Sequence, residues 1–299
     1  MAPPSPSPAL RALVAGLVDY AGLFPPAWLS MPEAAARYAS YLESADAWVL
    51  GRFVVPTARL GELAVNAARY VASAPHPWRL SALVGDDVAA DARRLRSFNA
   101  SYVGQLVVDA AEVKGADAEG IERATGALGD ALDVYVEVPH EPDPRRLLEV
   151  VRRAGARAKI RTGGVTPDVF PSAAQVARFI VRCAELDVPF KATAGLHHAL
   201  RGEHRLTYQR DAASATMFGF LNVFVAAALA SAGAGETDLV ALLEERRSTA
   251  FSFGGDGVRW RSQGVSLEQL VRARTSLAVA FGSCSFREPL DDLQELGLL

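Results

Sequence analysis

The sequence predicts a single TIM-type (β/α)8 barrel, on the basis of its length, its eight apolar segments of strand length and the helical segments between them. The 299 residues fall within the range of one α/β barrel, and 50% of them are hydrophobic, which is enough for a large core. Apolar strand segments alternate with helix-period segments at a spacing of roughly 30 residues, the pattern of parallel βαβ units. Eight such units predict a closed barrel, and an open doubly wound sheet is the alternative.

Eight segments rich in Val, Leu, Phe and Tyr are predicted as the strands, at residues 48–56, 79–85, 103–110, 133–139, 157–163, 189–195, 220–226 and 250–255. The seventh is ambiguous, because the surrounding run MFGFLNVFVAAALASAG is equally compatible with an apolar helix. Helices are predicted between the strands, at residues 57–72, 86–100, 117–129, 143–155, 172–187, 237–248 and 266–281.

Two extra helices, at about residues 9–22 and 32–44, precede the first predicted strand and are expected to cap one end of the barrel. The Pro-rich turn between them could cover the barrel mouth or plug the opposite end, and we expect the plug. The opening MAPPSPSPA has no basic region followed by an apolar core, so residues 1–9 are predicted to be a disordered tail rather than a signal peptide. Residues 10–299 are then one barrel domain that ends in a C-terminal tail, docked on the barrel or on a second subunit of a homodimer.

Composition argues against several classes of partner. A formal net charge of −3 offers no electrostatic footprint for nucleic acid or an anionic membrane. The uncharged stretch 212–235 is long enough to span a bilayer, but its Asn, Ser, Gly and Ala content argues against a membrane segment. Cys183 and Cys284 are too far apart in sequence to indicate a zinc site or a disulfide framework. We therefore expect a cytoplasmic protein that acts on a small molecule without a cofactor.

Lysine is rare in this chain, and its positions are informative. Lys occurs only at 114, 159 and 191, whereas every other one of the 31 basic residues is Arg. A guanidinium cannot form an imine, but a buried ammonium can lose its proton and become a nucleophile. Lys159 in AKIRTGG and Lys191 in FKATAG lie on the fifth and sixth predicted strands. Because the C-terminal ends of barrel strands form the active face, both are predicted catalytic residues.

Other charged residues are predicted to converge on the same pocket. Side chains alternate along a strand, so Arg161 is expected to share the side of Lys159, and Thr193 that of Lys191. Asp109 lies near the end of the third predicted strand, with Glu112 in the loop beyond, and Glu137 lies near the end of the fourth. Such a cluster of buried charges predicts a functional site, and a layer of structural ion pairs is the alternative.

This constellation predicts imine chemistry. Two neighbouring ammonium groups lower each other's pKa, and an apolar wall acts in the same direction, which would leave one lysine as a neutral amine. That amine could form an imine with an aldehyde or ketone, and the imine could serve as an electron sink for C–C cleavage or condensation. Asp109 or Glu137 could move protons, and Arg161 could bind a carboxylate or phosphate of the substrate through two parallel hydrogen bonds.

Polar residues beyond the sixth predicted strand are candidates for substrate binding. His197 and His198 follow that strand, and Asn222 lies on the seventh. A metal site is not expected, because the sequence has neither H-x-H nor H-E-x-x-H. The alternatives are a barrel isomerase, epimerase or hydrolase, with a divalent metal on Glu137, Asp109 and His197, and a binding barrel without catalysis.

KIRTG, followed 32 residues later by KATAG, resembles the KTSTG and KAxGG strands of the deoxyribose-phosphate aldolase type of class I aldolase. The resemblance covers about residues 103–196. It implies a carbon–carbon lyase for a small anionic carbonyl compound, in which Lys159 forms the Schiff base, Lys191 tunes it and Asp109 of LVVDA is the catalytic acid. Two features of this sequence differ from that family. The segment LHHALRGEH stands where the family has paired glycines, and the two lysines lie on the fifth and sixth predicted strands, whereas those of the family lie on the sixth and seventh.

Overall fold

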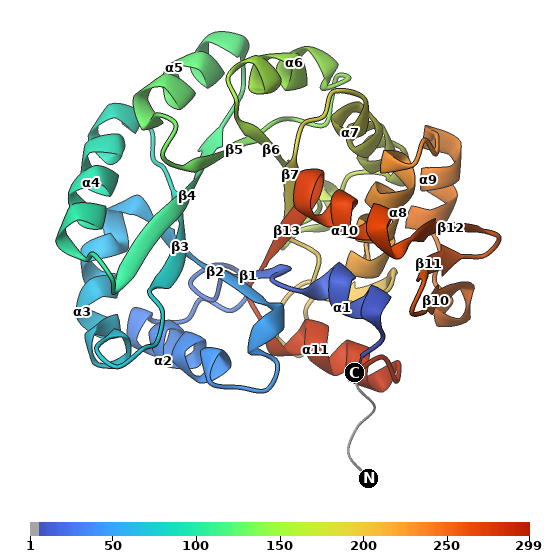
Figure 1. The fold of residues 1–299 in the computed structure, drawn as a ribbon, viewed down its shortest axis with the longest axis horizontal. Coiled ribbons are helices and arrows are strands. Elements are labelled where there is room, and N and C mark those ends of the chain that lie inside the picture. The colour runs from blue at the N-terminus through green and yellow to red at the C-terminus, as the bar shows by residue number, and fades with distance from the viewer. Residues whose placement is uncertain (1–5) are drawn as a thin grey trace.

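The computed structural model, which describes residues 6–299, is a closed barrel of eight parallel strands surrounded by helices (Figure 1). The strands pair in the order β1-β13-β7-β6-β5-β4-β3-β2, and β2 closes the barrel by pairing with β1. The predicted (β/α)8 barrel is therefore confirmed. Its strands are β1 (Val18–Tyr20), β2 (Leu50–Pro56), β3 (Trp78–Leu83), β4 (Leu106–Lys114), β5 (Asp133–Glu137), β6 (Arg157–Arg161), β7 (Phe190–Thr193) and β13 (Ala278–Ser283).

Helices cover the outside of the barrel and alternate with its strands (Figure 1). Those that follow the first six barrel strands in turn are α2 (Met31–Leu42), α3 (Leu60–Val71), α4 (Val88–Ser101), α5 (Ala118–Leu128), α6 (Arg145–Arg153) and α7 (Ala173–Glu185). The connection from β7 to β13 is longer. It contains the hairpin of β8 (Gly202–Arg205) and β9 (Ser214–Met217), the helices α8 (Phe220–Ser231), α9 (Glu236–Leu243) and α10 (Leu267–Ser276), and the antiparallel sheet of β10 (Phe251–Phe253), β11 (Gly257–Trp260) and β12 (Gln263–Ser266).

Six of the eight predicted strands are barrel strands, the seventh is a helix, and the eighth contains a strand that lies outside the barrel. Residues 220–226 belong to α8, whose residues 220–230 are all buried. A helix that is buried on every face has no amphipathic period, so its sequence cannot be distinguished from a buried strand by pattern alone. Residues 250–255 contain β10, which lies at the edge of the small sheet outside the barrel.

The two missing barrel strands overlap segments that were predicted as helices. β1 lies within the second half of predicted helix 9–22, and β13 begins in the last four residues of predicted helix 266–281 and continues to Ser283. Only Leu277 separates α10 from β13, so no Gly or Pro marks the boundary. With β1 counted, Lys159 and Lys191 lie on the sixth and seventh barrel strands.

The chain ends also differ from the prediction. α1 (Pro8–Val14) is an extra helix that packs against α10, whereas α2 is the barrel's own first helix. The C-terminal tail contains α11 (Arg287–Glu295), which follows β13. Residues 1–5 of the predicted tail lie outside the described residues. Because Pro8 begins a helix and Ala9 is fully buried, the predicted boundary at residue 9 is too late.

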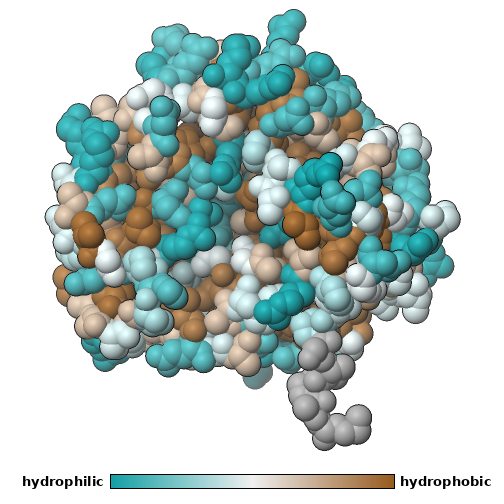
Figure 2. All heavy atoms as spheres, viewed as in Figure 1, coloured by the Kyte–Doolittle hydropathy of each residue, from teal (hydrophilic) through white to brown (hydrophobic). Residues whose placement is uncertain are grey.

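Charged side chains fill the N-terminal end of the barrel interior. Arg52 binds Asp109 and Asp133, with Nε 2.6 Å from Asp109 Oδ1 and Nη2 3.0 Å from Asp133 Oδ2. Arg157 and Arg79 complete this network through 2.6 Å ion pairs with Asp133 and Asp109 respectively. Figure 2 shows hydrophilic residues over the centre of the barrel, inside the ring of helices. The barrel interior is therefore polar at its N-terminal end, far from the loops that follow the C-terminal ends of the strands.

Candidate active site

A row of alternating acidic and basic side chains runs through the barrel interior toward its C-terminal mouth. Each member contacts the next through an ion pair, and the order is Asp19, Lys191, Glu112, Lys159, Glu137 and Arg161. Three cations thus face three carboxylates, so the row is neutral as a whole. Side-chain exposure rises from 1% at Lys191 to 49% at Arg161. The row joins a deeply buried ammonium to the solvent-exposed rim.

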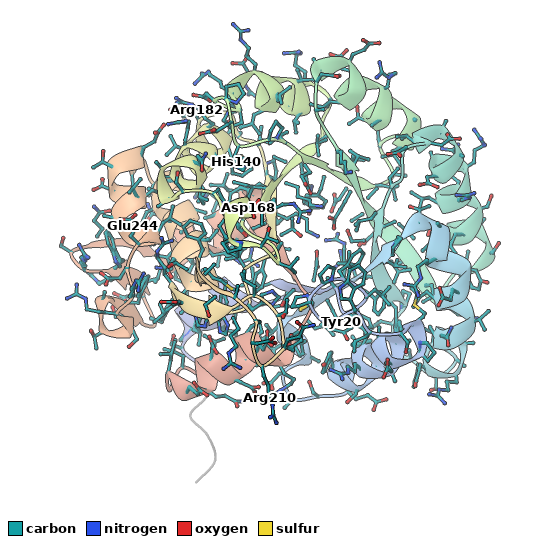
Figure 3. All side chains as sticks on the ribbon, turned by 180° about the vertical axis from the view of Figure 1, so that it is seen from behind. Tyr20, His140, Asp168, Arg182, Arg210 and Glu244 are labelled. Atoms are coloured by element: carbon teal, nitrogen blue, oxygen red, sulfur yellow. The ribbon has the colours of Figure 1, made fainter. Side chains whose placement is uncertain are left out.

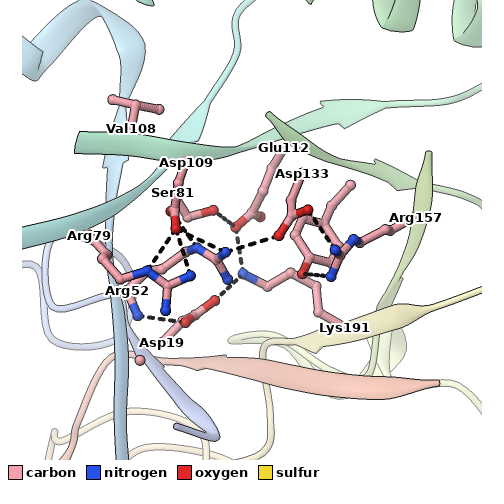
Figure 4. A network of polar contacts seen from close by, with 12 residues as sticks. Asp19, Arg52, Arg79, Ser81, Val108, Asp109, Glu112, Asp133, Arg157 and Lys191 are labelled. Atoms are coloured by element: carbon pink, nitrogen blue, oxygen red, sulfur yellow. Dashed lines mark hydrogen bonds and ion pairs between the residues drawn. The ribbon is translucent and has the colours of Figure 1, made fainter. Parts of the chain in front are cut away.

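The inner part of the row is centred on Lys191 of β7 (Figure 4). Its Nζ lies 2.6 Å from Asp19 Oδ2 and 2.8 Å from Glu112 Oε1. Asp19 Oδ1 also accepts a 2.8 Å hydrogen bond from the backbone N–H of Arg52, and Ser81 Oγ donates to Glu112 Oε1 at 2.8 Å. Every partner comes from a different strand, so the closed barrel assembles this group.

The outer part is centred on Lys159 of β6. Lys159 pairs directly with Lys191 in the strand register, which places both side chains at the same level of the barrel. Lys159 Nζ lies 2.7 Å from Glu112 Oε2 and 2.9 Å from Glu137 Oε2. Arg161 Nε lies 3.3 Å from Glu137 Oε1. Glu112 therefore bridges the two lysines, one through each carboxylate oxygen.

Electrostatic interactions keep both Lys191 and Glu112 ionised. Burial alone would lower the pKa of Lys191, but the carboxylates of Asp19 and Glu112 raise it above its usual value. Burial would likewise raise the pKa of Glu112, but the two ammonium groups hold it well below its usual range. The expectation that the lysines would lower each other's pKa is therefore wrong for Lys191, because Glu112 lies between them. Lys191 carries a fixed positive charge.

A cavity of about 280 Å³ opens at the C-terminal ends of the strands. Lys159, Glu112, Arg161, Thr193 and His197 line it, so the structure brings together half of the ten residues predicted for the pocket, and Glu137 lies next to Lys159 but outside the lining. Lys191 is not part of its lining and lies deeper in the barrel. The Pro-rich segment after β1 also lines this cavity, through Phe24, Pro25 and Pro26, so the expected plug at the opposite end is wrong.

Asp109 is not part of this cavity. β4 continues to Lys114, four residues beyond the predicted strand end, so Asp109 falls in the first half of the strand and Glu112 on the strand itself. Asp109 binds Arg52 and Arg79 in the network at the N-terminal end (Figure 4). The extension was missed because its residues, AEVK, are mostly weak strand formers. Glu112 occupies the position that the prediction gave to Asp109.

The two predicted histidines have different environments. His197 lines the cavity, and its Nδ1 lies 3.2 Å from Ser283 Oγ and 3.5 Å from Glu288 Oε2. His198 lies outside the cavity, with Nδ1 3.2 Å from Asp292 Oδ2 and its ring stacked on His204. Burial, with a smaller contribution from the two neighbouring histidines, lowers the pKa of His197 to about 4. His197 is therefore a neutral hydrogen-bonding group at pH 7.

We expect NMR titration to show that His197 stays neutral down to about pH 4. A folded-state pKa below the unfolded value favours folding above pH 6.5, and this contribution is lost as the pH falls from about 6.5 to 4. The loss amounts to about 3 kcal/mol of unfolding free energy by linkage. His197→Gln assigns the signal and should remove this part of the pH dependence, while the exposed His76 is the internal reference. A His197 signal that titrates near pH 6.5 would contradict the buried environment.

Asn222 is remote from the cavity because its segment is a helix. The side chain is completely buried in α8, where Nδ2 donates to the carbonyls of Leu242 and Glu245, each at 2.8 Å. Its Oδ1 accepts a hydrogen bond from the backbone N–H of Arg201 at 3.0 Å. The predicted contact with substrate is therefore wrong. Asn222 instead joins α8 to the backbone of Arg201 and to the backbone at the C-terminal end of α9.

Replacement of Asn222 with Ala is expected to lower the free energy of unfolding by roughly 3 kcal/mol, because it leaves buried backbone groups without partners. Ligand binding in the cavity should not change. Urea denaturation followed by circular dichroism measures the first effect, and titration of the folded variant measures the second. Unchanged stability would show that these hydrogen bonds do not contribute as described.

Asp19 and Cys284 are site residues that were not predicted from the sequence. Asp19 was hidden in a predicted helix, whereas Glu112 was predicted near the pocket but in a loop rather than on β4. Cys284 lines the cavity, but burial raises the pKa of its thiol to about 11, so it is not a thiolate at neutral pH. Its Sγ lies 3.5 Å from Tyr208 Oη. Figure 3 shows this molecule from behind the view of Figure 1, with Asp168 labelled in the loop after β6.

A scan against protein-family models gives no match, and no curated protein matches the sequence. Within residues 6–299, no three His, Cys, Asp or Glu side chains are placed to hold a metal ion, so Glu137, Asp109 and His197 do not form the alternative ligand set. In the same residues, no helix is long and apolar enough to cross a membrane. Fold and site together define a (β/α)8 barrel with a lysine–carboxylate pocket at its C-terminal end, and this fold is typical of enzymes.

Proposed function

We propose that this protein is a carbon–carbon lyase of the class I aldolase type, in which Lys159 forms a Schiff base with a small carbonyl substrate. One observation carries the proposal. Of the chain's three lysines, Lys159 is the one whose side chain lines the cavity of residues 6–299, and its Nζ lies within 2.9 Å of two carboxylates. A reactive amine thus has immediate partners for each proton transfer that imine formation requires.

Imine formation needs the proton of Lys159 to leave and return. Glu137 lies 2.9 Å away and is nearer the mouth than Glu112, so it accepts a proton from the Nζ ammonium before the amine attacks the carbonyl carbon. The attacking nitrogen gives a second proton to the carbonyl oxygen, which becomes the carbinolamine hydroxyl. Glu137 lies beside the cavity rather than in its lining, so it returns its proton to this hydroxyl through a water molecule, and the hydroxyl leaves as water. Arg161, hydrogen-bonded to Glu137, is placed to bind a polar or anionic group of the substrate at the rim, and Thr193 adds a hydroxyl.

The protonated imine then accepts the electron pair of the C–C bond that breaks. The β-hydroxyl group of the substrate gives its proton to Glu137 through a water molecule, the first carbonyl product leaves, and an enamine remains on Lys159. Protonation of the enamine carbon and addition of water release the second carbonyl product and restore the amine. Lys191 keeps Glu112 ionised throughout, and the Glu112 carboxylate, 2.7 Å from Lys159 Nζ, stabilises the positive charge of the protonated imine.

Two further observations support this class of reaction. Lys159 and Lys191 lie on the sixth and seventh barrel strands, which are the strands that carry the two lysines in the deoxyribose-phosphate aldolase type. Glu112 lies on β4, two strands before Lys159, where that family places its catalytic acid. Free, buried Cys183 and Cys284 agree with the proposed location in the reducing cytoplasm. A homodimer remains part of the proposal.

Borohydride trapping tests the proposed function. The protein would be treated with sodium borohydride and each member of a panel of small aldehydes and keto acids, and intact mass would be measured. The proposal predicts one reduced adduct per chain, with the mass of the carbonyl partner. If the folded protein gave no adduct with any carbonyl compound, an acid–base reaction that uses the same carboxylates without an imine would be favoured instead.

A further inference from the structure

The lining of the cavity is divided between a charged side and an apolar side. The charged side comes from β4 and β6, which supply Glu112, Lys159 and Arg161. The apolar side comes from β2, β3 and the loop after β1, and consists of Ala21, Phe24, Pro25, Pro26, Val54 and Leu83. We call these six residues the apolar wall. None of their side chains contains a hydrogen-bond donor or acceptor.

The barrel geometry produces this division. The side chains of Asp19, Arg52 and Ser81 point into the barrel, where they make the contacts described above. Since side chains alternate along a strand, the residues two positions further toward the mouth also face inward. On β2 and β3 these are Val54 and Leu83, and directly after β1 it is Ala21. The interior of these three strands therefore changes from polar to apolar at the level of the cavity.

The loop that completes the apolar wall is held in place by its own backbone. The N–H of Ala21 donates to the carbonyl of Ser283 at 2.7 Å, and the N–H of Trp28 donates to the carbonyl of Phe24 at 3.0 Å. A third bond joins Leu29 N–H to the carbonyl of Gly22 at 3.0 Å. A Cβ at Gly22 would collide with the ring of Tyr20, so this position requires glycine. The apolar wall is thus formed before a ligand binds, and binding does not have to order it.

From this arrangement we infer that the substrate carries a hydrocarbon group beside its carbonyl, and that this group packs against the apolar wall. The inference rests on the proposed function, because the carbonyl is placed by Lys159. Hydroxyl groups against the apolar wall would give up their hydrogen bonds to water without replacement, which disfavours polyhydroxylated sugars. An alkyl or aryl aldehyde or ketone instead loses only apolar contact with water, which favours binding. The substrate class is therefore a carbonyl compound with an apolar substituent.

A binding series that does not depend on the imine tests this inference. Linear alcohols from 1-propanol to 1-hexanol would be titrated into the intact protein, and the NMR signals of the Val54 and Leu83 methyl groups followed. Each added methylene is expected to tighten binding about fourfold until the chain reaches the mouth, whereas glycerol and erythritol should leave these signals unchanged. Equal binding of alcohols and polyols, or no shift of either methyl signal, would overturn the inference.

Matched variants locate the effect. Val54→Thr keeps the size of the side chain and adds a hydroxyl, so it should weaken binding of 1-pentanol several-fold. Val65→Thr, at an exposed site of α3, should have no effect. If both variants bound 1-pentanol with the same affinity, the apolar wall would not be the surface that binds it. Borohydride trapping with butanal is a separate result: its failure, together with tight alcohol binding, would reject the imine while leaving the apolar wall intact.

Discussion

Replacement of Lys159 with Arg is expected to abolish the borohydride-stable adduct and to lower turnover at least about 10³-fold. Arg keeps a positive charge between Glu112 and Glu137, so the ion pairs that stabilise the barrel interior can persist. It has no amine that can form an imine, so the chemistry alone is removed. Intact mass after borohydride treatment and steady-state rates with the carbonyl compound identified by trapping measure the two effects.

Lys114→Arg is the matched control. Lys114 is exposed at the end of β4, on the same face of the molecule, but is not part of the cavity lining. This variant should keep both the adduct and the rate. An adduct of undiminished yield in Lys159→Arg, with its circular dichroism spectrum unchanged, would remove Lys159 from the mechanism and direct attention to the other lysines.

Glu112→Gln is expected to cause the largest loss of stability. Glu112 is buried and binds both Lys159 and Lys191, so its replacement leaves two ammonium groups without their shared carboxylate. Breaking a buried pair from one side costs about 3–5 kcal/mol of unfolding free energy. Imine formation should also slow, because the carboxylate that stabilises the positive charge of the protonated imine at Lys159 is lost. Urea denaturation and the rate of adduct formation measure the two effects.

The stability difference should depend on pH in a defined direction. The pKa of Glu112 is lower in the folded protein than in the unfolded chain, so its contribution is complete above the unfolded value and is lost as the pH falls through the folded one. The difference in unfolding free energy between wild type and Glu112→Gln should therefore become smaller only below about pH 4. Glu122→Gln, at an exposed position on α5, is the control and should match wild type throughout. A difference that is absent at pH 7 would contradict the bridging role of Glu112.

The lysines were found from the sequence because both observations that identify them are local. Lys159 and Lys191 stand out against an Arg-rich composition, and each lies in a clear strand followed by glycine. Strand alternation then correctly placed Arg161 and Thr193 beside the same cavity. Glu137 was predicted at a strand end in the pocket; it lies next to Lys159, since β5 and β6 are adjacent in both sequence and space, but outside the cavity lining.

The rest of the site depends on distant parts of the chain. Asp19 binds Lys191 although 172 residues separate them, and this contact exists only because β1 and β13 close the barrel. β13 follows α10 with only Leu277 between them and no Gly or Pro, so the local pattern extended that helix into the strand. β1 follows α1 after three residues that include Gly16 at a φ of 58°, a helix-ending signal that the predicted helix 9–22 passed over. Asn222 was misplaced for a related reason, because complete burial removes the periodicity that separates helix from strand.

The most direct test of the central claim is to identify the residue that carries the reduced adduct. Wild-type protein would be trapped with borohydride and its carbonyl partner, digested and mapped by tandem mass spectrometry. The account predicts modification of Lys159 and none of Lys191, whose ammonium is buried between Asp19 and Glu112. An adduct on Lys191 or Lys114, with Lys159 unmodified, would contradict it.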